Sequence, residues 1–559
     1  YNECQDCYKC VRKCPVKSIR IQDGHAGVLS DKCIACGRCV ASCPSHAKRV
    51  RNDLEAVRQL LTTGKKVYVS LAPSWRGAFA NTSAQIVATF KKLGFTGVSE
   101  TALGAEAVSI ETARLLNEKE QGLMISSACP VIVRYIRLYR PQLAQYITPI
   151  ASPALTHAQI LKDTFGSDVA VVFVGPCIAK KTEADENPDL LAAALTFEEV
   201  KIWLKELDRE TEQGNCTGEV FVPETAHEGR IYPLDGGMNE TIRRIGVKEN
   251  VQLLNVGSLE FFIQASNAFD NTRLVRPVFI EALACHGGCI HGPCITTQAS
   301  DFYNISRVLR HTDYRDSIPL KPTAVVSKNY TPVSEMDKTY SMDEIREALH
   351  RIGKYLPEDE LNCAGCGYQT CQDMAKALLA GNAEPSMCVS YMRKIAAKKA
   401  DILIKSIPSA MVMLDKNLNM IEVNEAFIKM FTGPLAEVYL SDPQKLIGLP
   451  ISTFFKAQKV FVSVLTGGQE IHKENHRYNN CLYDLNVFPI EPNISIGAVI
   501  TDMTKASHSR ELVAQKAKSV IDKNIETVQQ IACLLGEHMV ETETILNTIA
   551  NEYTPEDED

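Results

Sequence analysis

Apolar residues change their spacing several times along the chain, and each change predicts a different kind of element. From residue 53 onward, short apolar runs alternate with segments of helical period. The runs at 66–71 and 169–174 predict strands, and 83–93 predicts a helix. The second run is continuous, which is typical of a parallel strand buried on both faces. The alternation predicts stacked α/β layers for this part of the chain.

The pattern changes again after residue 400. Four segments have the composition and alternation of strands, and Asn424 opens a short helix after the second of them. The predicted strands lie at 407–415, 419–423, 482–488 and 496–502. Strands and a helix in this order predict a separate α+β domain.

Residues 506–550 contain no proline and one glycine, Gly536. Apolar residues recur there at three- and four-residue intervals, which predicts one long amphipathic helix. Such a helix either pairs with a second copy as a parallel coiled coil or packs on its own domain. The stripe consists of Val528, Ile531, Leu535, Thr542, Ile545 and Ile549. The acidic end at 555–559 is expected to be disordered.

Length, composition and charge narrow the class of protein. A chain of 559 residues is expected to hold about three to four domains. Hydrophobic residues make up 45% and charged residues 23%, close to the globular average. The formal net charge of −7 argues against a nucleic-acid-binding surface. No apolar run reaches the roughly 18 residues that span a bilayer, so neither nucleic acid nor membrane is an expected partner.

Sixteen of the twenty cysteines fall into four groups of four. Two groups have the form Cys-x-x-Cys-x-x-Cys-x-x-x-Cys-Pro, the run of bacterial two-cluster ferredoxins, in which the fourth cysteine of each run ligates the other cluster. One 4Fe-4S cubane is therefore expected on Cys4, Cys7, Cys10 and Cys43, and a second on Cys14, Cys33, Cys36 and Cys39. Two zinc sites are the alternative. Metal spacings in so large a chain indicate a reducing compartment, and we expect the cytoplasm.

A third group of four cysteines has another spacing: Cys363, Cys366, Cys371 and Cys388. The segment 373–380 between its members predicts a helix that ends at Gly381-Asn382. This arrangement resembles the small 4Fe-4S domain of several redox-chain proteins, which implies a third accessory cluster. A zinc site is again the alternative.

The fourth group is dispersed, and its members lie in loops rich in glycine, proline or alanine: Cys129, Cys177, Cys285 and Cys289. The motifs in and near these loops are Ala72-Pro73-Ser74, Ser126-Ser127-Ala128-Cys129-Pro130, Pro176-Cys177-Ile178-Ala179-Lys180-Lys181 and Cys285-x-x-Gly288-Cys289. In this order, over residues 66–300, they resemble the catalytic domain of the iron-only (FeFe) hydrogenases.

The resemblance implies an H-cluster, in which a 4Fe-4S cubane on these four cysteines joins a di-iron unit carrying CO, CN and an azadithiolate. Cys289 would bridge the two parts. Lys180 and Ser152 match the family residues that donate to the cyanides, and a buried ammonium beside an anionic ligand forms a charge-assisted bond. Pro73 and Ser74, in the family's Ala-Pro loop, are also expected to bind the cofactor.

The chain departs from the family along the proton route. Ala128 stands where catalytic members have a cysteine that passes protons to the bridging amine. Thr112 and Leu115 occupy the relay positions of the acidic helix, and Leu283 and Gly175 stand where methionines are expected. Because general acid–base relays contribute about 10² to 10⁴ in rate, slow turnover is predicted. Candidates for another route, by proximity in sequence alone and each as readily a surface or structural residue, are Glu183, Glu281, His286 and His291.

The α+β segment after residue 400 resembles a PAS domain. Its Asn-x-Ala-Phe turn lies at 424–427 and its closing Asp-x-Thr at 502–504. No ligand set for haem or flavin is evident, so no PAS ligand is expected, and His472 and His476 are expected in loops. The remaining cysteines are interpreted as ordinary thiols: Cys216, Cys294, Cys481 and Cys533.

We therefore expect a multidomain α/β protein with five parts. They are a ferredoxin-like two-cluster domain (1–50), an α/β H-cluster domain (51–335), a small 4Fe-4S domain (336–399), an α+β PAS domain (400–505) and a C-terminal amphipathic helix with an acidic tail (506–559).

This combination resembles the PAS-bearing sensory group (group C) of the iron-only hydrogenases. It implies a slow hydrogenase (2H+ + 2e- ⇌ H2) that senses H2 or redox state and signals through the PAS domain. Expected partners are H2, protons, an electron carrier such as ferredoxin, a second copy of the chain bound through the PAS domain or terminal helix, and a kinase or phosphatase downstream. The alternatives are a metabolic ferredoxin-linked hydrogenase and a non-catalytic iron–sulfur protein related to cluster-assembly factors.

Overall fold

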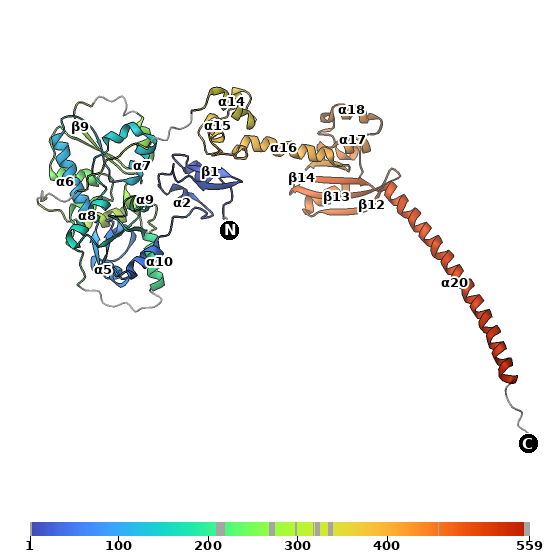
Figure 1. Cartoon of the computed structure of the whole chain (residues 1–559). Helices are drawn as coiled ribbons and strands as arrows, with labels where there is room; N and C mark the ends of the chain where they lie inside the picture. Colours follow the sequence, from blue (N-terminus) through green and yellow to red (C-terminus); the bar gives the residue numbers. More distant parts are fainter. Residues whose placement is uncertain are drawn as a thin grey trace, which may run out of the picture. The chain divides into compact units, whose positions relative to one another are not determined.

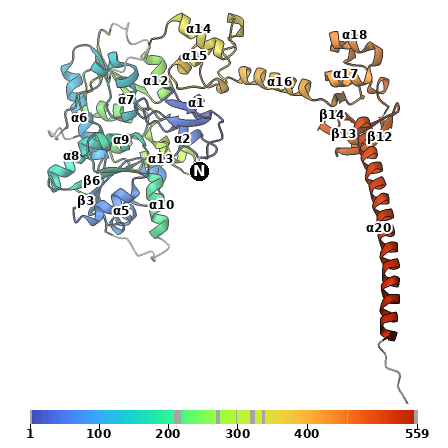
Figure 2. The same ribbon diagram turned by 45° about the vertical axis from the view of Figure 1, so that its right-hand side comes forward.

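The computed structural model describes residues 3–207, 218–267, 274–296, 299–316, 318, 325–333, 339–456 and 458–552, without the side chains of 207, 505–512, 532–541 and 547–552. Cys216 lies outside the described residues, as does the side chain of Cys533. The chain divides into two compact units, Tyr1–Met392 and Arg393–Asp559 (Figure 1 and Figure 2). No helix in the described part of the chain is long and apolar enough to cross a bilayer.

The first unit contains two parallel sheets. The larger has the strand order β4-β3-β6-β7, with β3 Val67–Leu71, β4 Gly97–Glu100, β6 Ala170–Gly175 and β7 Ala193–Thr196. The smaller has the order β5-β9-β8, with β5 Gly122–Ile125, β8 Gln252–Val256 and β9 Pro277–Ala282. The strands predicted at 66–71 and 169–174 are confirmed as β3 and β6. The parallel pairing is that of α/β layers.

Helices connect the strands and cover the sheets (Figure 1). They are α3 Leu54–Thr62, α4 Trp75–Ala78, α5 Ser83–Lys92, α6 Ala102–Glu118, α7 Pro130–Tyr139, α8 Pro153–Phe165, α9 Ala179–Glu186, α10 Phe197–Leu207, α11 Gly237–Ile245, α12 Leu259–Ser266 and α13 Asp301–Arg310. The helix predicted at 83–93 is confirmed as α5. α8 begins at Ser152, whose hydroxyl accepts the N–H of Leu155. This cap fixes the position of the Ser152 hydroxyl.

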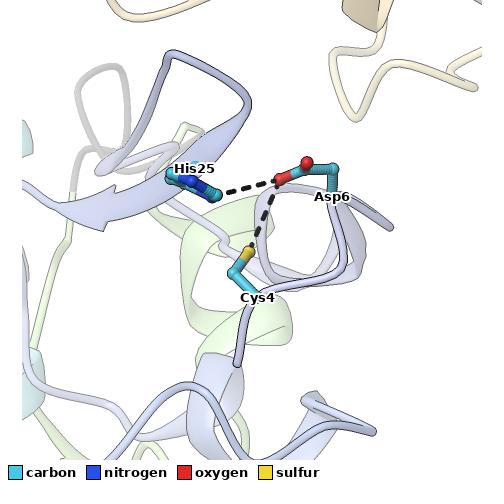
Figure 3. A group of neighbouring side chains, drawn as sticks. All are labelled: Cys4, Asp6 and His25. Atoms are coloured by element: carbon cyan, nitrogen blue, oxygen red, sulfur yellow. Dashed lines mark hydrogen bonds and ion pairs between the residues drawn. The ribbon is translucent and has the colours of Figure 1, made fainter. Parts of the chain in front are cut away.

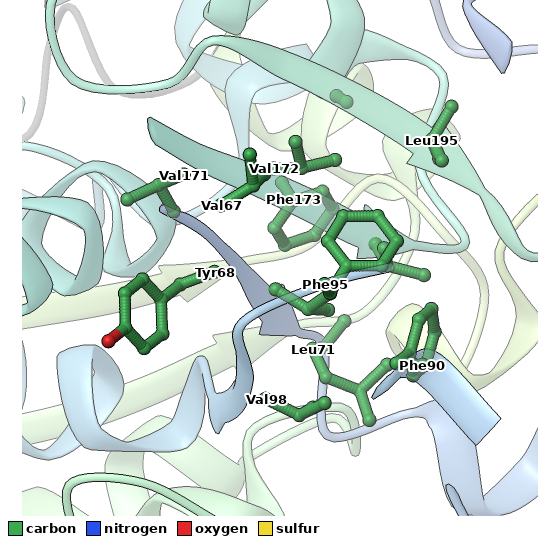
Figure 4. Packing of buried hydrophobic residues seen from close by; sticks show 14 of the residues in the cluster. Val67, Tyr68, Leu71, Phe90, Phe95, Val98, Val171, Val172, Phe173 and Leu195 are labelled. Atoms are coloured by element: carbon green, nitrogen blue, oxygen red, sulfur yellow. The ribbon is translucent and has the colours of Figure 1, made fainter. Parts of the chain in front are cut away.

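The larger sheet is buried on both faces. Every residue of β3 and of β6 is buried, as the continuous apolar run at 169–174 predicts. Figure 4 shows Leu71 near Phe90 and Phe95, among the residues that fill this core. Because burial of apolar surface stabilises by about 25 cal/mol per Å², the sheet is a firm base for the loops that follow β3 and β6.

A buried histidine joins α8 to this sheet. His157 Nδ1 lies 2.7 Å from Ser70 Oγ on β3, and its Nε2 lies 2.8 Å from Ser99 Oγ on β4. Burial lowers the pKa of His157 to about 3, so the ring is neutral, with one nitrogen that donates and one that accepts. α6 and α8 are so close that a Cβ on Gly104 would lie 2.2 Å from the carbonyl oxygen of Pro153. Both contacts hold the first turn of α8 in place.

The two short cysteine-rich regions share one hydrophobic core. The N-terminal region consists of α1 Lys9–Lys13, the antiparallel hairpin of β1 Ile19–Gln22 and β2 His25–Val28, and α2 Arg38–Ser42. The region of the third cysteine group contains α14 Met342–Arg351 and α15 Cys371–Leu379, which confirms the helix predicted at 373–380. Val11, Ile19 and Ile21 belong to the same core as Ile345 and Met387. The two regions therefore fold against each other.

The second unit is built on a five-stranded antiparallel sheet with the order β11-β10-β14-β13-β12. Its strands are β10 Ala410–Asp415, β11 Met420–Val423, β12 Ile471–Tyr478, β13 Cys481–Glu491 and β14 Ser495–Asp502. Its helices are α17 Glu425–Phe431, α18 Ala436–Ser441 and α19 Gln458–Gly467, and α16 Val389–Ser406 leads into it from the first unit. The four predicted strands are confirmed as β10, β11, β13 and β14, and Asn424 caps α17 as expected.

The prediction that His472 and His476 lie in loops is wrong. Both lie on β12, the edge strand, where they pair with Asn486 and Tyr483 of β13. Most of β12 is exposed, and its pairing shifts register between Lys473 and His476. A polar edge strand with a bulge lacks the alternation of apolar and polar residues that reveals a half-buried strand.

The helix predicted at 506–550 is confirmed as α20, Thr504–Glu552. Val528, Ile531 and Ile545 of the predicted stripe are 64%, 50% and 60% exposed. The side chains of Leu535 and Ile549 lie outside the described part of the chain. The described members of the stripe are thus not buried against the chain's own domain.

Candidate functional site

The four dispersed cysteines meet at one cavity. Cys129 follows β5 and caps α7, Cys177 follows β6, and Cys285 and Cys289 follow β9. All four therefore lie beyond the carboxyl ends of parallel strands, the usual place for sites in such sheets. Together they line a cavity of about 100 Å³. Gly288 allows the tight turn before Cys289, because a Cβ there would lie 2.3 Å from the carbonyl oxygen of Pro233.

The four thiols are placed for a positively charged ligand. Burial, followed by the effect of Cys129, raises the pKa of Cys177 to about 11. Burial and the neighbouring sulfurs likewise raise the pKa values of Cys285 and Cys289. The mutual effect shows that the sulfurs lie close together. Four buried thiolates are stable only beside compensating positive charge, and an iron cluster supplies it.

Most of the cavity wall is apolar, with a few polar groups. Ser74 is buried, and its hydroxyl has no hydrogen-bond partner among the described residues. Tyr232 also lines the cavity, and its hydroxyl lies 2.6 Å from Ser109 Oγ on α6. Pro73 and Lys180 complete this side. A buried hydroxyl without a partner fits a ligand that accepts hydrogen bonds, as the cyanides of an H-cluster would.

Lys180 brings a positive charge to the cavity wall. Its Nζ lies 2.9 Å from Ser152 Oγ and 2.5 Å from Glu183 Oε2, and all three side chains are buried. The ammonium also lies 5.8 Å from the centre of the Phe173 ring. The structure thus brings together Lys180 and Ser152, which the sequence analysis predicted as donors to the cofactor. These contacts leave Lys180 oriented before any ligand binds.

The four candidates for another proton route differ in burial and in their partners. Glu183 is buried in its pair with Lys180. Glu281 is buried and accepts the N–H groups of Met238 and Asn239, and burial raises the pKa of Glu281 to about 7. His286 is exposed, and His291 is partly exposed beside Asp301. None of the four candidates is among the described residues that line the cavity.

The structure places the residues at which the chain is predicted to depart from the family's proton route. Ala128 and Leu283 line the cavity and offer no ionisable group. The Thr112 hydroxyl donates to the carbonyl oxygen of Val108 on its own helix, and Leu115 packs against the core. A side chain at position 175 has no room, because a Cβ on Gly175 would lie 2.6 Å from the ring of Phe173. The ring of Phe173 therefore occupies the space that a methionine at position 175 would need.

Two residues near the site were not singled out by sequence reasoning for this role. Tyr232 has no motif around it, and only the fold brings it to the cavity. Cys294 was interpreted as an ordinary thiol; it is buried, burial and Cys177 raise its pKa to about 12, and its backbone N–H donates to Pro176. The Cys-x-x-x-x-Cys spacing from Cys289 was the available signal for its location.

The N-terminal cysteines lie close to one another. After the larger effect of burial, charge on Cys36, Cys33, Cys14 and Cys10 raises the pKa of Cys39. Charge on Cys4 acts likewise on Cys10. Cys14 of the first run thus lies near the second run, and the division into two interleaved cubanes stays a prediction.

Cys4 also lies beside two potential metal ligands. Asp6 Oδ1 is 3.7 Å from Cys4 Sγ and 3.7 Å from His25 Nδ1 (Figure 3). All three are near the surface, and Cys4 has a role in the predicted cubane. Asp6 and His25 are therefore neighbours of that cluster.

The third cysteine group is also compact. After burial, the charges of Cys388 and Cys363 raise the pKa of Cys366. Cys371 begins α15, and its N–H donates to the side chain of Asn362. Cys363 is exposed and Cys388 is buried.

Comparison with known proteins places these sites in families. Residues 65–293 match the family described as iron only hydrogenase large subunit, C-terminal domain. This segment is thus similar to the iron-only hydrogenases. Residues 1–44 match the 4Fe-4S dicluster domain family, and residues 359–390 match an Fe-S cluster family. The matches support an H-cluster and accessory 4Fe-4S clusters as the cofactors, in place of zinc.

Curated hydrogenases are similar to part of this chain. Iron hydrogenase 1 of Clostridium pasteurianum is 25% identical over 304 residues, which cover 44% of this chain and 52% of the relative. The NADP-reducing hydrogenase subunit HndD of Solidesulfovibrio fructosivorans is 26% identical over 311 residues, 43% of this chain and 51% of the relative. The chain thus spans about half the length of these relatives.

Solved structures with similar parts include a variant of the FeFe-hydrogenase HydA1 of Chlamydomonas reinhardtii. It is 16% identical with a TM-score of 0.37, and the match covers 50% of this chain and 99% of that one. The PAS domain of an HTR-like protein of Haloarcula marismortui matches 20% of this chain and 96% of its own, at 17% identity and a TM-score of 0.16.

We expect Lys180→Met to lower the free energy of unfolding by about 3–5 kcal/mol, because it leaves the Glu183 carboxylate buried without its partner. The double variant Lys180→Met/Glu183→Gln should recover most of this loss. Chemical denaturation of the apo protein measures both. The exposed pair Lys429–Glu425 is the control, where the coupling should stay below about 1 kcal/mol. Equal coupling in the two pairs would contradict the buried, pre-oriented Lys180.

Proposed function

We propose that the chain is a slow iron-only hydrogenase that interconverts protons and H2 and reports H2 or redox state through its second unit. The observation that carries the catalytic part is the convergence of Cys129, Cys177, Cys285 and Cys289 on one apolar cavity. In this proposal those thiolates would hold the cubane of the H-cluster, and Cys289 would also be a ligand of the di-iron unit. The bound group would supply the iron chemistry that cleaves or forms H2.

The protein's own part is to orient and enclose that group. Lys180 and Ser152 would donate hydrogen bonds to the cyanides, and the free hydroxyl of Ser74 is available for the same purpose. Pro73 lines the same wall. Apolar surroundings exclude water and strengthen each of these bonds, since electrostatic interactions grow as the local dielectric falls.

The two alternatives, a non-catalytic cluster-assembly protein and a metabolic hydrogenase, make different demands on Lys180 and Ala128. A non-catalytic cluster-assembly protein needs the four cysteines but has no use for a buried ammonium at the cavity. Lys180, with Ser152 and Ser74, therefore favours a di-iron unit. A metabolic hydrogenase needs fast proton delivery, and Ala128, which lines the cavity, gives none.

Infrared spectroscopy of the matured protein tests the catalytic proposal. Bands of bound CO and CN should appear, and Lys180→Met should shift or remove the CN bands because it deletes a donor. Lys181→Met is the matched control: Lys181 is the adjacent buried lysine, paired with Asp53 and Glu199, and does not line the cavity. Its CN bands should stay unchanged. Absence of CO and CN bands from the unsubstituted, matured protein would favour the non-catalytic alternative.

Restoring a thiol at the relay position tests the explanation for slow turnover. Ala128→Cys should raise the rate of hydrogen evolution, by up to about 10²-fold, because a positioned relay contributes that much. Leu283→Cys, which adds a thiol at another cavity-lining position, should give no gain. Hydrogen evolution with a chemical reductant measures both. An Ala128→Cys variant with unchanged turnover would contradict a blocked relay.

The sensory part of the proposal is supported by the second unit. Asn424 ties the segment after α16 to β10, since its side-chain amide donates to Ser409 O and its oxygen accepts the Met411 N–H. A shift of α16 would therefore act on the sheet directly. The exposed stripe of α20 supports a second copy of the chain as partner. An electron carrier such as ferredoxin, a downstream kinase or phosphatase, and a cytoplasmic location belong to the same proposal.

Hydrogen exchange tests the sensory part. Because a ligand shifts a two-state element only through its differential affinity, exchange in residues 400–552 should differ between protein under H2 and under mild oxidant. Protein without the di-iron unit is the control and should show no response to H2. Identical exchange in the matured protein under both conditions would end the sensory proposal while leaving the hydrogenase intact.

A further inference from the structure

We propose that Thr101 is a further residue that donates a hydrogen bond to the group bound in the cavity, and that His157 is its positioning residue. A row of four buried side chains, which we call the hydroxyl relay, ends at the cavity. It consists, in order, of Ser99, His157, Ser70 and Thr101. The inference rests on the proposed function for the identity of the acceptor, which is an atom of the di-iron unit.

Each link of the hydroxyl relay is a hydrogen bond of ordinary length. Ser99 Oγ lies 2.8 Å from His157 Nε2, and Ser70 Oγ lies 2.7 Å from His157 Nδ1. Ser70 Oγ also lies 2.8 Å from Thr101 Oγ1. All four side chains are buried. Bulk water therefore does not compete for these bonds.

Thr101 is the member of the relay that lines the cavity. Its backbone N–H donates to the carbonyl oxygen of Leu71 at the end of β3, which fixes its position. Thr101 also precedes α6, but its hydroxyl makes no capping bond to that helix. Within the part of the chain that the structure describes, Ser70 Oγ is the single partner of this hydroxyl. The rest of its hydrogen-bonding capacity is available to a ligand in the cavity.

The direction of the bonds depends on which nitrogen of His157 carries the hydrogen. Burial lowers the pKa of His157 to about 3, so the ring is neutral, and one nitrogen donates while the other accepts. A hydroxyl has one hydrogen to donate and can accept two. The two tautomers of His157 therefore give the hydroxyl relay two opposite directions.

One of these directions satisfies every donor inside the relay. With the hydrogen on Nδ1, Ser99 donates to Nε2, Nδ1 donates to Ser70, and Ser70 donates to Thr101. The hydrogen that remains is that of Thr101, at the cavity wall. With the hydrogen on Nε2, the bonds reverse, and the Ser99 hydrogen has no acceptor among the described residues. Because a buried donor without an acceptor is costly, the Nδ1–H tautomer is favoured, and Thr101 donates into the cavity.

The strand order places Thr101 away from Cys177. Thr101 follows β4 and Cys177 follows β6, and β3 lies between these strands. Adjacent strands lie about 4.8 Å apart, so the ends of β4 and β6 are roughly 10 Å apart. The loop after β3 carries Pro73 and Ser74, which are expected to bind the cofactor. This position favours the di-iron unit over the cubane as the acceptor, and the cyanide nitrogens and dithiolate sulfurs of that unit accept hydrogen bonds.

Infrared spectroscopy of the matured protein tests this contact. Thr101→Val removes the hydroxyl with little change of shape, and at least one CO or CN band should shift because the di-iron unit loses a donor. Thr101→Ser keeps a hydroxyl and should return the bands toward those of the unsubstituted protein. Unshifted bands in Thr101→Val would overturn the contact while leaving the proposed hydrogenase intact.

Thr156→Val is the matched control. Thr156 is also fully buried, lies next to His157 on α8, and is not among the described residues that line the cavity. Its hydroxyl has no hydrogen-bond partner in the described part of the chain. The bands of Thr156→Val should equal those of the unsubstituted protein. An equal shift in Thr156→Val and Thr101→Val would show a general effect of packing and would overturn the contact.

A double variant tests His157 as a positioning residue. In His157→Phe no ring nitrogen sets the direction, so Thr101 can donate to Ser70, and the band affected in Thr101→Val should shift in the same direction. Thr101→Val/His157→Phe should then shift that band no further than Thr101→Val alone, because the donor is already absent. Additive shifts would show that His157 acts on the site by packing, and would overturn its positioning role.

Nuclear magnetic resonance tests the direction of the relay without the di-iron unit. Protein that carries only its 4Fe-4S clusters is prepared with isotopically labelled histidine, and the signal that His157→Phe lacks is assigned to His157. At about pH 5 this ring also stays neutral, whereas exposed histidines with the ordinary pKa of about 6.5 are protonated, which identifies the signal independently. The hydrogen should lie on Nδ1. A hydrogen on Nε2 would overturn the proposal.

The two measurements separate this inference from the proposed function. Absence of CO and CN bands from the unsubstituted, matured protein would reject the hydrogenase, and with it the acceptor named here. The position of the hydrogen on His157 needs no di-iron unit and would still decide the direction of the hydroxyl relay. CO and CN bands that are present but indifferent to Thr101→Val would reject the Thr101 contact alone.

Discussion

Four thiolates must reach one point from three different parallel strands, and this requirement governs the first unit. Cys129 follows β5, Cys177 follows β6, and the last two cysteines follow β9. β6 pairs with β3 in one sheet, whereas β5 pairs with β9 in the other. A slip of one residue in any of these strands would turn its cysteine away from the cavity. The buried core that fixes strand register is therefore also what assembles the candidate metal centre.

The same core holds the polar groups of the cavity in position. His157 joins α8 to β3 and β4, and α8 begins at Ser152, which lies beside Lys180. Lys180 in turn pairs with Glu183 on its own helix. A buried ammonium is stable only with such partners, and the partners also fix its direction. The two partners therefore fix the position of an ammonium group on a residue that lines the cavity.

Local sequence signals predicted the parts of the molecule that depend on local chemistry. β3 and β6 followed from the runs of apolar residues, and α15 from a segment that ends at Gly381-Asn382. Cysteine spacing predicted three of the four cysteine groups, and the loop motifs around the dispersed cysteines predicted the fourth. Contacts between distant segments left no such signal. Tyr232 meets Ser109 across 123 residues, and the core shared by Val11 and Tyr368 joins the first and fourth hundred of the chain. β12 was missed because its exposed, polar residues do not alternate.

The departures from the catalytic hydrogenases are connected through packing. The ring of Phe173 occupies the space that a side chain at position 175 would need, and the same ring faces the Lys180 ammonium. Ala128 and Leu283 leave the wall apolar at the positions where the family has a thiol and a methionine. The predicted metal ligands and cofactor donors are thus present, while the expected relay thiol is replaced by an alanine. In the proposal that the chain senses H2, this combination favours binding and electron exchange over fast proton delivery, since a sensor must respond to its ligand without consuming much of it.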